Sequence, residues 1–334
     1  IACGNTFVLK PSEKDPSCPI KLAELAIEAG FPPGVLNCVN GDKESVDALL
    51  EDKDVQAISF VGSTPIAEYV YHTGTKNNKR IQALGGAKNH MVIMPDADVE
   101  KTTDAIIGSA FGSAGERCMA ISVAVCVGKE TNNKIKKSLL EKTSKLNVGP
   151  YTDEKTDFGP LSSEAHYKKV LGYIDSGEKE GAKLLADGRN FKKQGYENGY
   201  FVGPTIFDEV KPEMKIYKEE IFGPVLSMMT TKKYEDALKL VNDHELGNGA
   251  AVFTKSGNIA KHFTENAKIG MIGVNVPIPV PVAYHSFGGW KRSLFGDHSI
   301  HGPDGVRFYT KLKTATITWN EDNAGPEFTI PVLS

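Results

Sequence analysis

The sequence has 334 residues, of which 40% are hydrophobic and 24% are charged, and its formal net charge is -3. This length and composition are typical of a globular protein of about two domains. The small negative charge argues against the basic surface that nucleic-acid binding requires. No apolar run reaches the roughly 18 residues that span a bilayer, so we expect neither a nucleic-acid nor a membrane partner.

The five cysteines are an odd number, widely spaced and without a CxxC pair. This usage favours a reducing compartment over a disulfide framework, so we expect a bacterial cytoplasm, or the mitochondrial matrix if the source is eukaryotic. No clustered His/Cys pattern or HExxH motif predicts a metal site. The chain begins at Ile1 with neither an initiator Met nor a charged leader, so we expect it to be part of a longer polypeptide.

The first part of the chain alternates short apolar runs with helical patterns. Strands are predicted over residues 6–10, 35–39, 57–61, 80–84 and 90–94, and helices over 20–29, 45–50 and 64–73. Strands separated by helices of about ten residues predict a parallel sheet with helices on both faces, which is an α/β fold.

The second part predicts another α/β domain. Helices are expected over residues 99–111, 133–146, 163–177, 234–242 and 258–266, strands over 121–127, 201–207, 225–230 and 250–253, a surface loop over 181–199 and a turn over 288–293. Residues 306–319 alternate over a long span and predict a terminal strand. A long exposed edge needs a partner, either a second subunit or its own chain.

Residues 112–120 place Cys118 beside Arg117 at the end of a run of small residues. A neighbouring guanidinium favours the thiolate, which is the nucleophilic form of cysteine. A small buried hydrophobe is the alternative role for such a cysteine.

Two further segments are candidates for ligand contact. Residues 60–65 end a strand and start a helix at Ser63, where free N–H groups and the helix dipole favour binding of an anion. The alternative is a well-capped helix without a ligand. No GxGxxG motif is present in the sequence. Lys10 and Glu13 follow the first predicted strand, where open α/β sheets bind ligands and where the pair could contact ribose hydroxyls. A solvated turn is the alternative for this pair.

An ordered series of motifs resembles the aldehyde dehydrogenase superfamily. The series comprises residues 4–5 with 10–13, 30–37, 60–64, 84–86, 112–120, 219–224 and 287–289. The resemblance implies a parallel-sheet NAD-binding domain (C-terminal portion only, residues 1–85), an α/β catalytic domain (86–304) and an oligomerisation strand with a tail (305–334). It also implies a homodimer or homotetramer.

The resemblance assigns a role to particular residues. Cys118 would be the nucleophile and Ser63 would contact the pyrophosphate of NAD. The adenosine ribose end of the cofactor would be held by Lys10, Glu13 and Lys14. The nicotinamide would be bordered by the backbone of Leu84 and Gly85, and its ribose oriented by Glu220 and Phe222.

Residues 83–90 and 115–120 resemble one branch of the family in particular, the CoA-acylating enzymes that act on malonate and methylmalonate semialdehyde. Hydrolytic members carry at position 83 a glutamate that activates water; Ala83 has no proton to exchange, so the acyl-enzyme would wait for the thiol of coenzyme A. Arg117 at the site mouth would bind the substrate carboxylate. A hydrolytic enzyme using Glu116 or Glu220 as its base, or an inactive fragment, are the alternatives.

Overall fold

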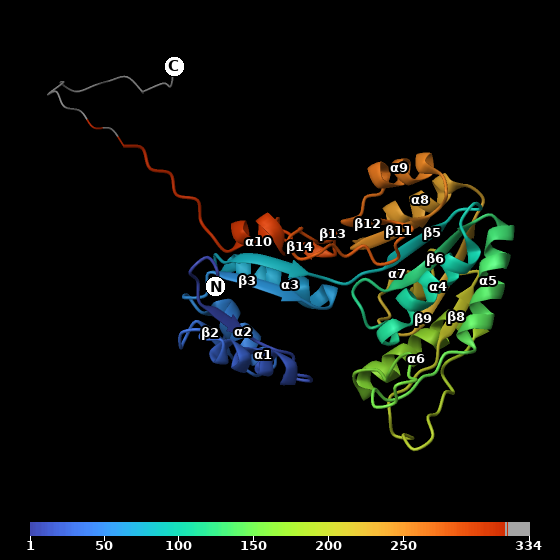
Figure 1. Ribbon diagram of the computed structural model, residues 1–334, viewed down its shortest axis with the longest axis horizontal. Helices are drawn as coiled ribbons and strands as arrows, with labels where there is room; N and C mark the ends of the chain where they lie inside the picture. The colour runs from blue at the N-terminus through green and yellow to red at the C-terminus, as the bar shows by residue number, and fades with distance from the viewer. Residues whose placement is uncertain (318, 320–334) are drawn as a thin grey trace.

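The computed structural model describes residues 1–317 and 319 (Figure 1). Its first part contains two parallel strand pairs, each with its own helices. One pair joins β1 to β2 and contacts α1, and the other joins β3 to β4 and packs on α3, which in turn contacts α2. The elements are β1 (Phe7–Leu9), α1 (Ser17–Glu28), β2 (Leu36–Cys38), α2 (Lys43–Glu51), β3 (Ala57–Val61), α3 (Thr64–Lys76) and β4 (Arg80–Leu84).

The larger part is built on a seven-stranded sheet of order β12-β11-β5-β6-β9-β8-β7, in which the pairs are parallel except β7 with β8. Its strands are β5 (Asn89–Ile93), β6 (Ile121–Val127), β7 (Lys183–Ala186), β8 (Thr205–Asp208), β9 (Val225–Thr231), β11 (Gly249–Phe253) and β12 (Met271–Val274). The central strands β5, β6 and β9 are almost continuously buried, because helices cover both faces of a parallel sheet.

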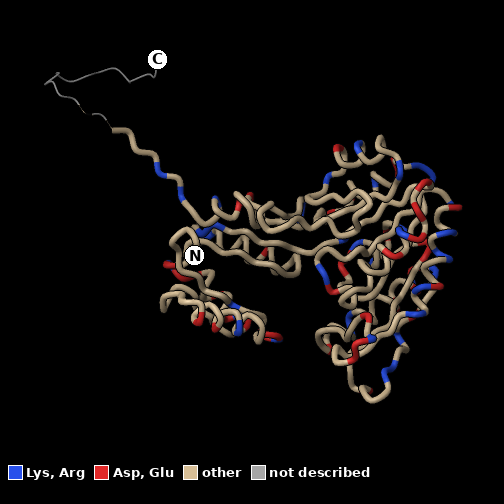
Figure 2. Tube along the Cα trace, in the orientation of Figure 1, with Lys and Arg blue, Asp and Glu red and all other residues tan. Residues whose placement is uncertain are grey.

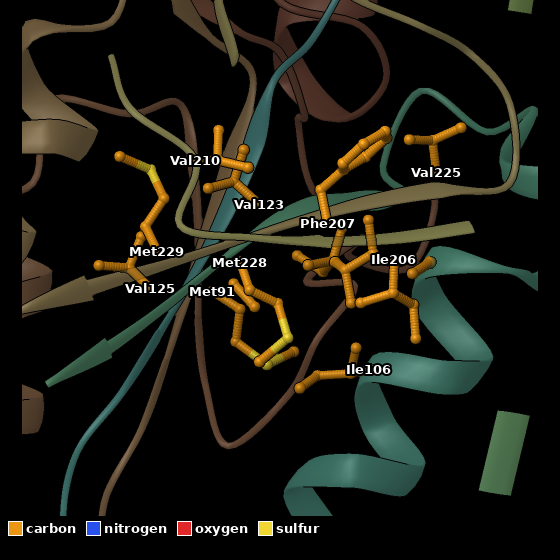
Figure 3. Close-up of a cluster of buried hydrophobic side chains, with 14 of the residues drawn as sticks. Met91, Ile106, Val123, Val125, Ile206, Phe207, Val210, Val225, Met228 and Met229 are labelled. Atoms are coloured by element: carbon orange, nitrogen blue, oxygen red, sulfur yellow. The ribbon is translucent and has the colours of Figure 1, made fainter. Parts of the chain in front are cut away.

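The helices of this part pack around the sheet, with α8 and α9 at its upper side and α6 below in Figure 1. They are α4 (Val99–Ala110), α5 (Lys129–Thr143), α6 (Glu164–Lys179), α7 (Lys215–Lys218), α8 (Tyr234–Asp243) and α9 (Gly257–Asn266). Figure 3 shows part of the core they enclose, where apolar side chains of β5, β6, β8 and β9 meet Ile106 of α4.

The chain returns to the first part after β12. The short strand β13 (Trp290–Lys291) pairs with β10 (Leu246–Gly247), while β14 (Leu294–Phe295) pairs antiparallel with β4. Helix α10 (Gly302–Phe308) follows, and the Arg80 guanidinium donates to three carbonyls at its C-terminal end, those of Arg307, Phe308 and Thr310. Residues 294–308 therefore lie against the first part, although the predicted domain boundary is at residue 304.

The α/β class is confirmed, and several predictions of detail are wrong. The polar segment 181–199 contains the edge strand β7, and the strand predicted from residue 201 begins at Thr205. The terminal strand predicted over 306–319 is wrong at its start, because Val306 to Phe308 complete α10. Residues 311–317 are exposed and belong to no helix or strand, and the remainder of the predicted tail, residues 318 and 320–334, lies outside the described part.

Basic and acidic side chains are interspersed along the described chain, as Figure 2 shows. Many pair at the i,i+4 spacing of exposed helices, for example Lys134 with Glu130 and Lys168 with Glu164. Among the described residues, no helix combines the length and apolar character required to cross a bilayer.

Candidate active site

The loop that carries Cys118 is a strained turn after α4. Ser113, Ala114 and Gly115 follow one another with φ of 53°, 55° and 72°, the left-handed region that disfavours side chains. Gly115 also has no room for a Cβ, which would overlap the carbonyl of Gly223. A turn of this kind persists only where its surroundings hold it, and such strain gathers at functional sites.

Two buried asparagines hold the residue that follows this turn. Asn89 and Asn248 each donate from Nδ2 to the carbonyl oxygen of Cys118 at 2.9 Å. Asn89 also donates to the Ala120 carbonyl at 3.0 Å and accepts from the Gly249 N–H at 2.9 Å. The peptide after Cys118 is thereby fixed from β5 and from the residue that precedes β11. The sequence did not predict this role of the two asparagines.

The surroundings of the Cys118 thiol favour its protonated form, because they raise its pKa. Partial burial raises its pKa, the nearby carboxylate of Glu220 raises it further, and the backbone N–H groups of Cys118 and Met119 oppose the shift. Arg117 is not among the causes of this shift. The prediction that Arg117 favours the thiolate therefore finds no support here.

The guanidinium of Arg117 turns toward α4. Its Nε donates to Ser113 Oγ at 3.0 Å, and its Nη1 lies 3.5 Å from the Gly108 carbonyl. Arg117 is exposed, and it forms no ion pair with any carboxylate of the described residues. A guanidinium that is exposed and has no carboxylate partner within the described part of the chain, one residue before Cys118, is able to bind an anionic ligand bidentately.

Residues 219–223 form the opposite wall of the site. Glu220 is largely buried, which raises the pKa of its carboxyl group, while a hydrogen bond of 3.0 Å from the Ala87 N–H and the nearby Lys88 charge oppose the rise. Phe222 has a φ of 58°, and its carbonyl oxygen lies 2.6 Å from His166 Nε2. Figure 1 places α6, which carries His166, below the central sheet.

A small cavity of about 20 Å³, room for a single water, joins these two segments. Its lining includes Arg117 of the loop that carries Cys118, Asn89 of β5, and Glu220 and Phe222 of the opposite wall. The structure thus brings together residues that the sequence separates by more than a hundred positions.

The predicted cofactor residues fall into two groups. Ser63 is the N-cap of α3 and makes no capping hydrogen bond with its side chain, and the adjacent Thr64 Oγ1 accepts from the Gly86 N–H at 2.9 Å. A Cβ at Gly86 would meet Glu220, and the Gly85 N–H donates to the Ser293 carbonyl at 3.0 Å. Ser63, Leu84 and Gly85 are therefore linked through this turn to the Cys118 site.

The second group lies at the end of β1. Lys10 Nζ donates to the Gly41 carbonyl at 2.8 Å and lies 3.6 Å from Glu13 Oε2, so the two side chains lie together. Their contact with a ribose stays a prediction. Lys14 is exposed beside it, and its backbone N–H is 3.2 Å from Ser12 Oγ.

Ala83 is fully buried. Its methyl group belongs to the smaller core cluster with Leu50, Ala67, Val70 and Ile81. Ile81 and Ala83 share one face of β4 by strand alternation, the face that packs on α3. The interpretation that the side chain at position 83 faces the acyl group on Cys118 is not supported by this packing.

The sequence of the chain is similar to those of known proteins. A sequence model of the aldehyde dehydrogenase family matches residues 1–315. A malonate-semialdehyde dehydrogenase of Pseudomonas aeruginosa is 57% identical over 335 residues, covering 100% of this chain and 67% of the relative.

Solved structures show the same relation. The methylmalonate-semialdehyde dehydrogenase of Oceanimonas doudoroffii superimposes with a TM-score of 0.95 at 56% identity, covering 96% of this chain and 66% of that one. A Sinorhizobium meliloti protein solved in complex with NAD gives the same TM-score and coverage at 58% identity. The chain therefore spans about two thirds of the length of these relatives.

Proposed function

Because the chain belongs to the aldehyde dehydrogenase family, we propose that it is part of an NAD-dependent dehydrogenase that oxidises malonate or methylmalonate semialdehyde and transfers the acyl group to coenzyme A. The products would be acetyl-CoA or propanoyl-CoA, CO2 and NADH. Relatives named for these two semialdehydes support the substrate class.

The unpaired Arg117 beside Cys118 is the observation that carries this proposal. A semialdehyde of a dicarboxylic acid has an aldehyde at one end and a carboxylate at the other. A cysteine for the first and an exposed guanidinium for the second stand on adjacent residues, and the guanidinium is not consumed by a protein carboxylate among the described residues.

The chain's own residues then act in a defined order. Cys118 loses its proton and adds to the aldehyde carbon, and its backbone N–H stabilises the resulting oxyanion. Asn89 and Asn248 fix the peptide that follows, which keeps Cys118 in register with the substrate. NAD, when bound, would supply the hydride acceptor, and Cys118 would hold the oxidised substrate as an acyl-cysteine.

The residues present fit NAD. The N-terminus of α3, with the free hydroxyl of Ser63, suits a pyrophosphate, and the tight Gly85–Gly86 turn allows close approach of the nicotinamide ring beside Leu84. Glu220 and Phe222 stand where they could orient the nicotinamide ribose. Lys10, Glu13 and Lys14 would hold the adenosine ribose end.

Release of the acyl group distinguishes the main proposal from its rival. The carboxylate held by Arg117 leaves as CO2, and the electron pair of the broken C–C bond passes into the thioester carbonyl to give an enolate, which takes a proton from solvent. The thiolate of coenzyme A then attacks the thioester carbonyl, and Cys118 leaves as the thiolate. The rival is hydrolysis with a glutamate base. Glu116 is engaged by other groups and is therefore not free to act as this base. Its Oε1 accepts a hydrogen bond from the Ser162 N–H at 3.3 Å and lies 3.3 Å from His166 Nε2. Glu220, which acts electrostatically on Cys118, is the remaining candidate.

The deciding experiment follows NADH formation from malonate semialdehyde with and without coenzyme A. We expect turnover to stop after about one NADH per active site when coenzyme A is omitted, because the acyl-enzyme accumulates. Sustained turnover at the full rate without coenzyme A would refute the acylating function and favour Glu220-dependent hydrolysis.

Arg117→Leu separates substrate recognition from chemistry. We expect it to raise KM for the semialdehyde by about 10- to 100-fold, the loss of a charge-assisted contact, with Kd for NAD unchanged. Ser113→Ala, which removes the Nε partner of Arg117 but keeps the guanidinium, is the matched control and should change KM far less. An unchanged KM in the leucine variant would show that Arg117 does not bind the carboxylate.

We also propose a homodimer or homotetramer that uses the segment after α10. Leu312, Ile317 and Trp319 are 97%, 68% and 88% exposed, which is costly for an unpartnered segment and supports contact with another subunit. Sedimentation of the protein before and after removal of residues from 311 onward would test the assembly.

A further inference from the structure

Lys88 is a buried lysine that no step above uses. It lies between the Gly85–Gly86 turn and β5, and only 2% of its surface is exposed. Its Nζ donates to the backbone carbonyl of Glu219 at 2.8 Å. Long charged side chains are rarely buried completely, because removing an ammonium group from water is costly. A lysine in such a place therefore depends on the partners that compensate its burial.

The Lys88 ammonium group acts on the neighbouring carboxylate. Burial raises the pKa of the Glu220 carboxyl group, and the two strongest opposing influences are the Ala87 N–H and the Lys88 charge. Residues 87–88, in the connection between β4 and β5, thus supply both a hydrogen bond to Glu220 Oε1 and a positive charge that acts on the same carboxylate. The same lysine fixes the backbone immediately before Glu220.

We propose that Lys88 is a positioning residue for cofactor binding, which holds the Glu219–Glu220 backbone and keeps the Glu220 carboxylate ionised and in place for the nicotinamide ribose. The proposal rests on the cofactor role of Glu220 in the proposed function. In this role Lys88 acts through Glu220 and not through a contact of its own with cofactor or substrate.

Other charged and titratable groups surround this pair. The Glu219 carboxylate accepts a hydrogen bond of 2.6 Å from the Tyr173 hydroxyl, and Lys169 of α6 acts on Glu220 more weakly than Lys88 does. On the other side, burial lowers the pKa of His90 and His244, so both imidazoles are neutral near pH 7. Lys88 is therefore the stronger of the two cationic influences that favour the Glu220 carboxylate.

The ionisation of Lys88 gives the proposal a pH signature. Burial lowers the pKa of Lys88 to about 7, with Glu220 and Glu219 opposing the shift. Below that pH the ammonium group is present and favours the Glu220 carboxylate. Above it the amine is neutral, and Glu220 loses that support. We therefore expect the affinity for NAD to fall as the pH rises through about 7.

The test measures Kd for NAD by calorimetric titration between pH 6 and 8.5, for the wild type, Lys88→Met, Glu220→Gln and the double variant. At pH 6 we expect Lys88→Met to raise Kd about tenfold, or about 1.4 kcal/mol. In the Glu220→Gln background the same change should have less than about a twofold effect, because a neutral amide needs no cation. Lys79→Met is the matched control, since Lys79 is 6% exposed but caps α2 through the Asp52 and Val55 carbonyls.

Each outcome is decisive. An equal effect of Lys88→Met in both backgrounds, or an effect no larger than that of Lys79→Met, would show a merely structural lysine and overturn the proposal. If Lys88→Met does not fold, the pH dependence of Kd decides: it should be present in the wild type and absent in Glu220→Gln, and its persistence in Glu220→Gln would overturn the proposal. A protein that binds NAD normally but does not oxidise malonate semialdehyde would refute the proposed function alone.

Discussion

Replacement of Asn89 by alanine should destabilise the protein far more than replacement of Asn248. Asn89 is 1% exposed, and its amide satisfies the carbonyls of Cys118 and Ala120 and the N–H of Gly249. The alanine variant leaves the Ala120 carbonyl and the Gly249 N–H without this partner. At about 1–3 kcal/mol for each of these two buried unsatisfied groups, we expect a loss of about 2–6 kcal/mol.

Asn248→Ala is the matched control. It removes one of the two donors to the Cys118 carbonyl, which keeps Asn89, so the expected loss is about 1 kcal/mol. Urea denaturation of both variants measures the difference, and the rate of iodoacetamide labelling of Cys118 reports whether the loop has moved. Equal losses of stability, or a larger loss for Asn248→Ala, would refute the account of Asn89 as the principal support of the catalytic loop.

Two further predictions concern the loop and the buried lysine. Gly115→Ala should lower the free energy of unfolding by at least about 1–2 kcal/mol and sharply reduce activity, because φ at this residue is 72° and the new methyl group overlaps the Gly223 carbonyl. The control is Gly108→Ala in α4, which has open space at its Cβ and should raise the free energy of unfolding by about 0.5–1 kcal/mol. Thermal unfolding compares the two variants, and a Gly115→Ala variant as stable as the wild type would contradict the close packing. The pKa of Lys88 is near 10.5 in the unfolded chain and about 7 in the folded chain, so between these values only the unfolded chain holds the proton. The free energy of unfolding of the wild type should therefore rise relative to that of Lys88→Met between pH 7 and 10. If denaturant titrations show the same pH dependence of stability in both proteins, the pKa of Lys88 is not lowered.

The residues that could be predicted from sequence are those whose signal is local. Cys118 stands in a contiguous run of small residues, and Ser63 stands between a strand and a proline-led helix. The strands of the central sheet could also be predicted, because β-branched runs such as residues 121–127 are typical of buried strands. The short strands β13 and β14 could not be predicted, because each contains two residues, which is too few to show a periodic pattern.

The support of the site could not be predicted, for a physical reason. Lys88, Asn89 and His166 act through hydrogen bonds to residues 131, 29 and 56 positions away, and no local pattern encodes such partners. The sequence did contain one indication of this support. Lys88 and Asn89 directly precede the predicted strand 90–94, and polar side chains that enter a core with such a strand need hydrogen-bond partners there. Strand alternation could likewise have placed Ala83 with Ile81 in the core instead of at the thiol.

The contacts among the supporting residues imply that the two walls of the site move as one unit. Gly115 packs on the Gly223 backbone, His166 spans from the Phe222 carbonyl to Glu116, and Lys88 ties the Glu219 carbonyl to the start of β5. A displacement of the Cys118 loop must therefore carry the Glu220 segment with it. The group at Lys10 is different, because it is held by the β1–β2 unit. Substitutions in the walls should accordingly change nucleophile reactivity and nicotinamide binding together, whereas those at Lys10 or Glu13 should affect cofactor affinity alone.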